Sequence, residues 1–379
     1  MIQRLILSVL FVFLNFLSPV YAHTHEENVQ YASGIVQSIV SETQNKTLQE
    51  SFGGNQAIQT LKVKIMNGDY KGKTVEVQNQ LTSNPAYDIK VQPGDRVVLD
   101  IEKNGSHLDI NISDRERFPS LLILSGIFIS LLLIIGGMKG LKSLLSLGIT
   151  SSLVLFILIP AILNKFPILP VTIAVAALST VLTVFIIGGF NLKSVAACIG
   201  TFGGVVSAGL ISFLIIKIAP LSGLHDQESI ILWSSRPDLN FTGLLASAMI
   251  IGALGAIMDV GISIASSIAE VKSVDNSLTV KQLIKSGLNV GKDIMGAMSN
   301  TLILAYIGSF LPLILLAANA PLFKLINLNS IATEITAAVG GSIGIILSVP
   351  ITALTAGYLM GTKVSINDSI KSYVEQNKE

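Results

Sequence analysis

Asp259 is the acidic side chain that lies furthest inside a long apolar stretch of this 379-residue chain. A charged aspartate at the centre of a membrane helix costs about 2.5–3.5 kcal/mol on insertion scales, so its face must meet protein or water. Residues three and four positions apart share one face of a helix. By that rule, the Asp259 face carries the small or polar residues Gly252, Ala256, Ser263, Ser266 and Glu270.

A second polar face is predicted where the next apolar stretch begins. Its polar and small residues are Lys292, Asp293, Gly296, Ser299, Asn300 and Thr301, followed by Tyr306. If this face meets the Asp259 face, carboxylate, amide and hydroxyl groups converge, which suits a proton, a hard cation or a polar solute. The alternative is a buried hydrogen-bonded network that only fixes helix packing, at about 0.6 kcal/mol per interhelical contact.

Small residues at every fourth position predict close helix packing. The residues concerned are Gly200, Gly204 and Ala208, together with Gly252, Gly340 and Gly344. No strand or phosphate-loop pattern surrounds them, so packing is favoured over a ligand cradle.

The composition predicts that these residues lie in membrane helices. Apolar residues make up 50% of the chain, charged residues 13%, and the mean hydropathy is +0.67; a typical soluble protein has about 25% charged residues. A single soluble globule is therefore excluded, and the lone Cys198 excludes a disulfide scaffold. The net charge of +1 offers no basic field for nucleic acid. No hydrolase, kinase, zinc-protease or nucleotide motif is present, so we expect neither an enzyme nor a cofactor.

Residues 1–22 have the pattern of a signal peptide. Arg4 precedes an apolar run, and Val20 and Ala22 flank a larger residue just before His23. An uncleaved membrane anchor is the alternative. After cleavage, a free amine with His25 in third position could hold Cu(II) or Ni(II) together with His23, although chance in a polar terminus explains these histidines better.

Residues 23–117 are predicted to form a small extracytoplasmic β-rich domain, a closed barrel of OB or SH3-like type. Alternating apolar residues and intervening turn signals place its strands at Ser33–Val40, Ile58–Ile65, Thr74–Val77, Arg96–Ile101 and Leu108–Ile112.

Residues 118–362 are predicted to be an all-α polytopic membrane bundle with about seven transmembrane helices, followed by a cytoplasmic tail at 363–379. About 20 helical residues are needed to cross a bilayer. The expected spans are Leu121–Gly136, Leu141–Leu158, Val171–Gly189, Val195–Ile218, Phe241–Ile264, Asn300–Ala318 and Ile335–Met360. Basic residues are more frequent on the side of the C-terminus, which places that end in the cytoplasm.

Two loops between the spans are long. Ser266–Ser299 interleaves apolar residues with lysines, which predicts an amphipathic helix lying on anionic lipid. Pro220–Asn240 holds His225, Asp226 and Trp233 and is predicted to be a solvated outer loop rather than a gate.

Two stretches, MDVGISIASSIAEV (Met258–Val271) and GKDIMGAMSNTLILAYIG (Gly291–Gly308), resemble the signature stretches of the YibE/F family of bacterial membrane proteins. GGSIGIILSVPITAL (Gly340–Leu354) adds to the resemblance, which spans essentially the whole mature chain. It implies a multi-pass protein of the bacterial cytoplasmic membrane and adds weight to Asp259, Asp293 and Asn300, but it implies no particular activity.

The leading hypothesis from the sequence is a permease or ion-coupled transporter component that moves a small ion or polar solute and uses the intramembrane acidic and polar residues. The alternative is a non-transporting scaffold or sensor whose outer domain binds a partner. An enzyme acting within the membrane is third, because no nucleophile and base pair is visible. Expected partners are the lipid bilayer and either another membrane protein or a second copy of the chain.

Overall fold

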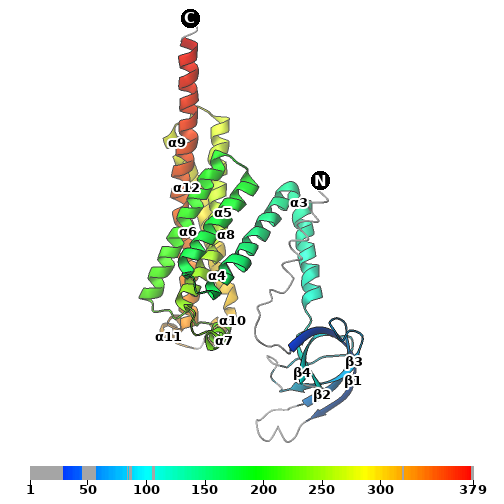
Figure 1. The fold of residues 1–379 in the computed structure, drawn as a ribbon. Coiled ribbons are helices and arrows are strands. Elements are labelled where there is room, and N and C mark those ends of the chain that lie inside the picture. Colours follow the sequence, from blue (N-terminus) through cyan, green and yellow to red (C-terminus); the bar gives the residue numbers. More distant parts are fainter. Residues whose placement is uncertain are drawn as a thin grey trace. The chain divides into compact units, whose positions relative to one another are not determined.

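The computed structural model describes residues 29–44, 57–82, 84, 88–104, 107–317 and 320–376. The described residues up to Ile134 form one compact unit, and those from Ile135 onward form another (Figure 1). The predicted signal segment and the candidate metal ligands His23 and His25 lie outside the described residues.

The first unit contains an antiparallel five-stranded sheet in the order β3-β2-β1-β4-β5. All five predicted strands are confirmed, and their bounds are β1 (Val29–Gln44), β2 (Ala57–Ile65), β3 (Thr74–Leu81), β4 (Arg96–Asn104) and β5 (His107–Arg115). In β2, Leu61, Val63 and Ile65 are fully buried and the two intervening lysines are exposed, which is the two-residue period of a half-buried strand.

The sheet is a half-barrel, so the predicted closed barrel is wrong in this respect. β3 and β5 are the two edges of the hydrogen-bonded order, and the segment 88–91 contacts both of them. Asn79 of β3 donates to the carbonyl of Ile89 at 2.8 Å, and Arg115 of β5 donates to the carbonyl of Lys90. Val91 of the same segment is fully buried. Side-chain hydrogen bonds to this segment therefore replace a ladder between the edges.

β1 can pair with both β2 and β4 because it is long and bends. Its register against β2 shifts between Val36 and Ser38, as expected where a bulge bends a strand. At Gly34 a Cβ atom would lie 2.6 Å from Val63 Cγ1 and 2.9 Å from Leu99 Cδ1. Glycine is therefore required at the point where β1 passes over the core.

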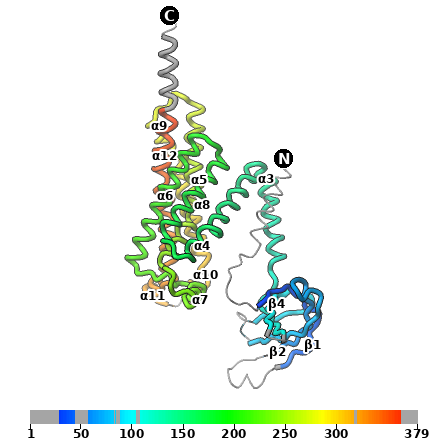
Figure 2. The backbone as a smooth tube through the Cα atoms, viewed as in Figure 1, coloured from blue at the N-terminus to red at the C-terminus, as the bar shows by residue number. Residues whose placement is uncertain are grey.

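The second unit is helical, and the boundary between the two units lies within α3, the helix that follows β5. In chain order, the helical elements after β5 are α3 (Phe118–Leu153), η1 (Val154–Leu158), α4 (Ile159–Leu163), α5 (Ile168–Gly188), α6 (Leu192–Ile218), α7 (Gln227–Ser235), α8 (Phe241–Val274), α9 (Val280–Ser309), α10 (Leu311–Ala317), α11 (Leu322–Ile326) and α12 (Asn329–Gln376). Figure 2 shows α5, α6, α8, α9 and α12 as the long helices of this unit.

Five segments of the described chain are long and apolar enough to cross a membrane, so the seven predicted spans are not confirmed. The first two predicted spans belong to one apolar stretch, Phe118–Leu163, in which a kink at Gly137, with a φ of 52°, separates two helices. The span predicted at Asn300–Ala318 is divided between the end of α9 and α10. Lys292 and Asp293 reduce the apolar character of α9 itself. The other segments are Ile168–Gly188, Leu192–Ile218, Phe241–Val274 and Asn329–Thr362.

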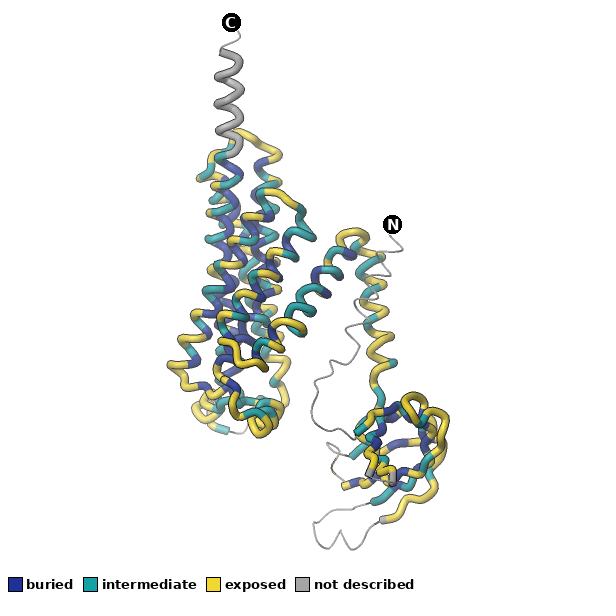
Figure 3. Tube along the Cα trace, viewed as in Figure 1, coloured by how far each residue is buried: buried dark blue, intermediate teal, exposed yellow. Residues whose placement is uncertain are grey.

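The core of the helical unit lies between α6, α8 and α12, where buried residues run along the inner helices (Figure 3). On α8, Ile250, Ile257, Ile264 and Ile268 are fully buried. Their spacings of seven and four residues form one apolar face of the helix. Because lipid tails are as apolar as these side chains, close packing rather than the hydrophobic effect holds such a core together in a bilayer.

The first half of α9 is an amphipathic helix, as predicted, but its apolar face packs on protein. Leu283 is fully buried, and Gly287 and Gly291 lie against Ile268 of α8 and Val349 of α12. The prediction that this helix lies on anionic lipid is therefore wrong for its apolar face. Glycine in place of larger residues lets α9 approach the two helices instead.

Candidate functional site

α6 and α12 approach each other along the small residues that the sequence singled out. A Cβ atom at Gly200 would lie 1.8 Å from Thr352 Oγ1, and one at Gly204 would lie 2.9 Å from the carbonyl oxygen of Gly344. In return, a Cβ atom at Gly344 would lie 2.7 Å from the Cβ atom of Ala208. Gly340 leaves more room, since its nearest neighbour would be Ser212 Oγ at 3.4 Å. This contact is a helix crossing with no space for a ligand.

α8 and α9 lie antiparallel, and their contacts set their register. Gly252 of α8 lies against the hydroxyl of Tyr306, and a Cβ atom there would be 2.8 Å from it. Towards the other end, Gly291 of α9 lies against Ile264 of α8. Asp259 falls between these two contacts. It is therefore level with the α9 segment 296–299, close to the middle of both helices.

The Asp259 face of α8 is not covered by the described helices. Asp259, Gly252, Gly255 and Glu270 are exposed, whereas Ser263 and Ser266 are half-buried. A Cβ atom at Gly255 would meet nothing within 4 Å. Asp259 makes no hydrogen bond or ion pair within the described part of the chain. Its carboxylate therefore stands about 27 Å along α8 from Phe241, at 1.5 Å per residue, beside open space.

The corresponding face of α9 is open at the same level. Asp293, Asn300 and Thr301 are exposed, and a Cβ atom at Gly296 would meet nothing within 4 Å. Thr301 donates only to the carbonyl of Ala297, within its own helix. Ser299 turns inward: its Oγ is buried and has no hydrogen-bond partner among the described residues. The structure thus brings the two predicted polar faces to one level and leaves the space beside them unfilled.

Sequence reasoning missed a second group of titratable residues at the end of the unit where α7 lies. Tyr306 is close enough to Glu334 of α12 to interact with it electrostatically, and Glu334 is in turn close to His225 and Asp226. The signal was present: His225 and Asp226 directly precede α7, and Glu334 lies in the first turns of α12. Without the fold, nothing indicated that these segments meet.

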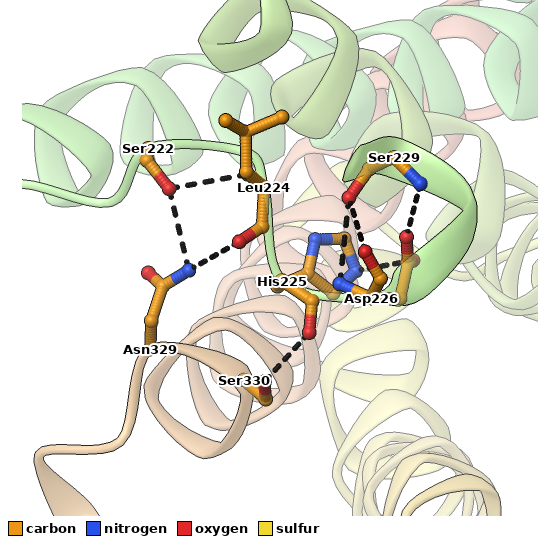
Figure 4. A network of polar contacts seen from close by, with 7 residues as sticks. All are labelled: Ser222, Leu224, His225, Asp226, Ser229, Asn329 and Ser330. Atoms are coloured by element: carbon orange, nitrogen blue, oxygen red, sulfur yellow. Dashed lines mark hydrogen bonds and ion pairs between the residues drawn. The ribbon is translucent and has the colours of Figure 1, made fainter. Parts of the chain in front are cut away.

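The loop that carries His225 is fixed to α12 by three hydrogen bonds (Figure 4). The side chain of Asn329 donates to Ser222 Oγ at 3.3 Å and to the carbonyl of Leu224 at 2.9 Å, and Ser330 Oγ donates to the carbonyl of His225 at 2.6 Å. Asn329 and Ser330 open α12. The predicted solvated loop is therefore ordered by the start of the last long helix.

His225 itself is held between a carboxylate and the protein interior. Its Nε2 lies 3.2 Å from Asp226 Oδ2, and its Nδ1 is buried with no partner among the described residues. Burial raises the pKa of Asp226, but hydrogen bonds from the N–H and hydroxyl of Ser229 and the nearby His225 outweigh it, and the pKa is lowered. Asp226 is therefore anionic at neutral pH and is available to pair with a protonated histidine.

A metal site is not built from the residues that the structure describes. They include no group of three or more His, Cys, Asp or Glu side chains placed to hold an ion. Cys198 is half-buried within α6 and forms no disulfide.

Comparison with protein families gives two matches. The model described as YibE/F-like protein matches residues 124–362, and the model described as YibE/F family N-terminal domain matches residues 30–115. Neither the curated proteins nor the solved structures gave a match.

Proposed function

Since the chain belongs to the YibE/F-like family and carries five helices suited to a bilayer, we propose that it is a permease or ion-coupled transporter component. Its substrate class is a proton, a small cation or a polar solute, bound at the level of the membrane helices where Asp259 of α8 and the Gly296 and Asn300 face of α9 lie. The protein sits in the bacterial cytoplasmic membrane with residues 23–117 outside and the C-terminus inside. This orientation rests on the distribution of basic residues between the predicted loops.

One observation carries the proposal: among the described residues, Asp259 lies mid-helix, uncovered and unpaired, at the level of an equally uncovered polar face of α9. An aspartate that only fixed helix packing would be paired with a neighbouring helix, because an unpaired charge in hydrocarbon is costly. Among the described residues, Asp259 has no such partner. A water-filled path would solvate the Asp259 carboxylate without a protein partner.

The titratable residues near the α7 end support a proton or cation as the substrate. His225 and Asp226 lie close to Glu334, Glu334 lies close to Tyr306, and the Tyr306 hydroxyl lies over Gly252. Gly252 is seven residues from Asp259, or about 10 Å along α8. Groups that can hold a proton or bind a cation therefore follow one another from the loop to Tyr306, about 10 Å along α8 from Asp259.

Access to water is the first quantity to measure. Cys198 is the only cysteine, so a Cys198→Ala background makes every introduced thiol unique. In membranes, we expect Gly255→Cys and Gly296→Cys to react with a membrane-impermeant maleimide. Leu210→Cys is the matched control, because Leu210 is 59% exposed on α6 and faces lipid in the proposed arrangement. Protection of Gly255→Cys and Gly296→Cys to the same degree as Leu210→Cys would exclude a hydrated site.

Flux is the second quantity. Proteoliposomes containing a pH-sensitive dye report proton movement across their membrane. The native chain should dissipate an imposed proton gradient, or move protons when a gradient of a candidate cation is imposed. Asp259→Asn should do neither. Glu228→Gln is the control, since Glu228 is an exposed acidic residue of α7 outside the membrane helices. If Asp259→Asn and the native chain give equal flux for every ion and solute tried, Asp259 does not carry transport.

The uncovered glycines also favour a second candidate, a scaffold in which another membrane helix covers the Asp259 face. At Gly255 and Gly296 a Cβ atom would meet nothing within 4 Å, so a partner backbone could approach closely there. Crosslinking through Gly255→Cys in native membranes separates the two proposals. A defined crosslinked partner, together with unchanged flux in Asp259→Asn, would favour the scaffold.

A further inference from the structure

The helical unit contains a cavity of about 350 Å³ at its α7 end, away from Asp259. Three membrane helices meet there: Leu169 is in the first turn of α5, Ile216 and Lys217 are in the last turn of α6, and Gly243 is in the first turn of α8. Because each of these helices begins or ends at the cavity, it lies at the level of the lipid headgroups.

The cavity combines apolar walls with two positive features. Leu169, Phe213 and Ile216 supply apolar surface. The ammonium of Lys217 lies 4.3 Å from the centre of the Phe213 ring, and Lys217 has no acidic partner in the described part of the chain. Lys217 is thus an unpaired cation held against an aromatic ring at the edge of an apolar pocket.

The second positive feature is the start of α8. This helix has 34 residues, and Thr242 and Gly243 of its first turn line the cavity. Asn240 caps the helix by accepting from the N–H of Gly243 at 3.0 Å, which leaves other N–H groups of the first turn without intrahelical partners. Such groups favour an anion, in the same direction as Lys217.

We propose that this cavity binds the headgroup of an anionic phospholipid. The phosphate would lie between Lys217 and the first turn of α8, and the first methylene groups of the lipid would lie against Leu169 and Ile216. The volume equals about twelve water-sized volumes, which suits a phosphate with its glycerol group and leaves the acyl chains in the bilayer. This site is separate from the proposed transport site and does not depend on it.

Lipid retention by the purified full-length chain tests the proposal. The chain is extracted from membranes into mild detergent, incubated with phosphatidylglycerol or phosphatidylcholine, and examined by native mass spectrometry. We expect phosphatidylglycerol to be retained more strongly. Lys217→Gln should retain about fivefold less of it, the factor that one basic residue near an anionic surface brings, and Lys217→Arg should retain it as the native chain does.

Lys165→Gln is the matched control. Lys165 lies in the loop between α4 and α5, which joins the same end of the bundle, but it is paired with Asp238 at 3.1 Å and does not line the cavity. Its loss should leave lipid retention unchanged. Equal retention by Lys217→Gln, Lys165→Gln and the native chain would overturn the proposal.

Two measurements on the native chain decide the matter even if Lys217→Gln folds poorly. Equal retention of phosphatidylglycerol and phosphatidylcholine would show that the cavity does not select an anionic lipid. If inorganic phosphate alone raised the unfolding temperature of the delipidated chain as much as phosphatidylglycerol does, the cavity would be a site for soluble anions, and the lipid proposal would be wrong.

Discussion

Replacing Gly204 by alanine should force α6 away from the two helices that it crosses. The new Cβ atom would lie 2.6 Å from Ile257 Cγ2, 2.8 Å from Ser348 Cβ and 2.9 Å from the carbonyl oxygen of Gly344. Two of these three atoms belong to a backbone or lie next to one, so a rotamer change cannot make room. The helices must separate by several tenths of an ångström at a buried crossing.

The expected cost follows from two opposing effects. Overpacking a well-packed core costs about 1–3 kcal/mol, and alanine gains about 1 kcal/mol over glycine inside a helix. Gly204→Ala should therefore lower the free energy of unfolding by about 0–2 kcal/mol. Gly296→Ala is the matched control, because its Cβ atom would meet nothing within 4 Å. It should be neutral or raise stability by up to about 1 kcal/mol.

Equilibrium unfolding in mixed detergent and SDS micelles, followed by circular dichroism, measures both variants. A Gly344→Ala variant completes the test, since a Cβ atom there would lie 3.0 Å from the carbonyl oxygen of Gly204. The double variant should cost less than the sum of the two single ones, because both act at one crossing. If Gly204→Ala and Gly296→Ala were equally stable, the close approach of α6 and α12 would be refuted.

Three further outcomes are expected. Lys272→Met should destabilise the helical unit by about 1–3 kcal/mol in the same assay. The buried Lys272 ammonium donates to two loop carbonyls, at 2.7 and 2.9 Å, and both carbonyls would lose their partner. A neutral result would show that water replaces the ammonium. Hydrogen bonds from Arg236 and Lys165 lower the pKa of Asp238 to about 2. A carboxyl with a lowered pKa adds stability above its ordinary value of about 3.9 and loses it as the pH falls towards 2. Asp238→Asn should therefore flatten the unfolding temperature between these pH values, and an unchanged profile would contradict the ion pairs. Gly34→Val should make the β unit of the full chain more sensitive to limited proteolysis, because its side chain would overlap Val63 and Leu99; unchanged digestion would show that β1 can shift.

The strands could be predicted from sequence because their signal is local. In β2, Leu61, Val63 and Ile65 alternate with lysines, and a two-residue period has only one structural meaning when turn residues bound it. How the sheet ends was not predictable in this way. The β3 edge is covered because Asn79 donates to the carbonyl of Ile89. This contact has no repeating pattern in the sequence.

The candidate site likewise has features that the sequence predicts and features that it does not. The Asp259 face of α8 could be drawn from the helical period alone, and so could the Asp293 and Asn300 face of α9. That the two faces lie at the same level could not be predicted from the sequence. The register of two antiparallel helices depends on which side chains interlock, here Tyr306 over Gly252 and Ile264 against Gly291. The amphipathic half of α9 shows the same limit: periodicity identified its apolar face but not whether lipid or protein covers it.

By itself, the sequence determined that the chain has a β-rich part and a membrane-suited helical part, and which side chains would be costly in hydrocarbon. Composition and period suffice for that, since both report the solvent that each face prefers. Only the tertiary structure decided the rest: the covered edge of the half-barrel, α9 packed against protein, His225 brought near Glu334, and Asp259 left without a partner among the residues that the structure describes. Each of these features depends on contacts between residues far apart in the chain. The sequence shows whether a face prefers apolar or polar surroundings, but not which segment of the chain will cover it.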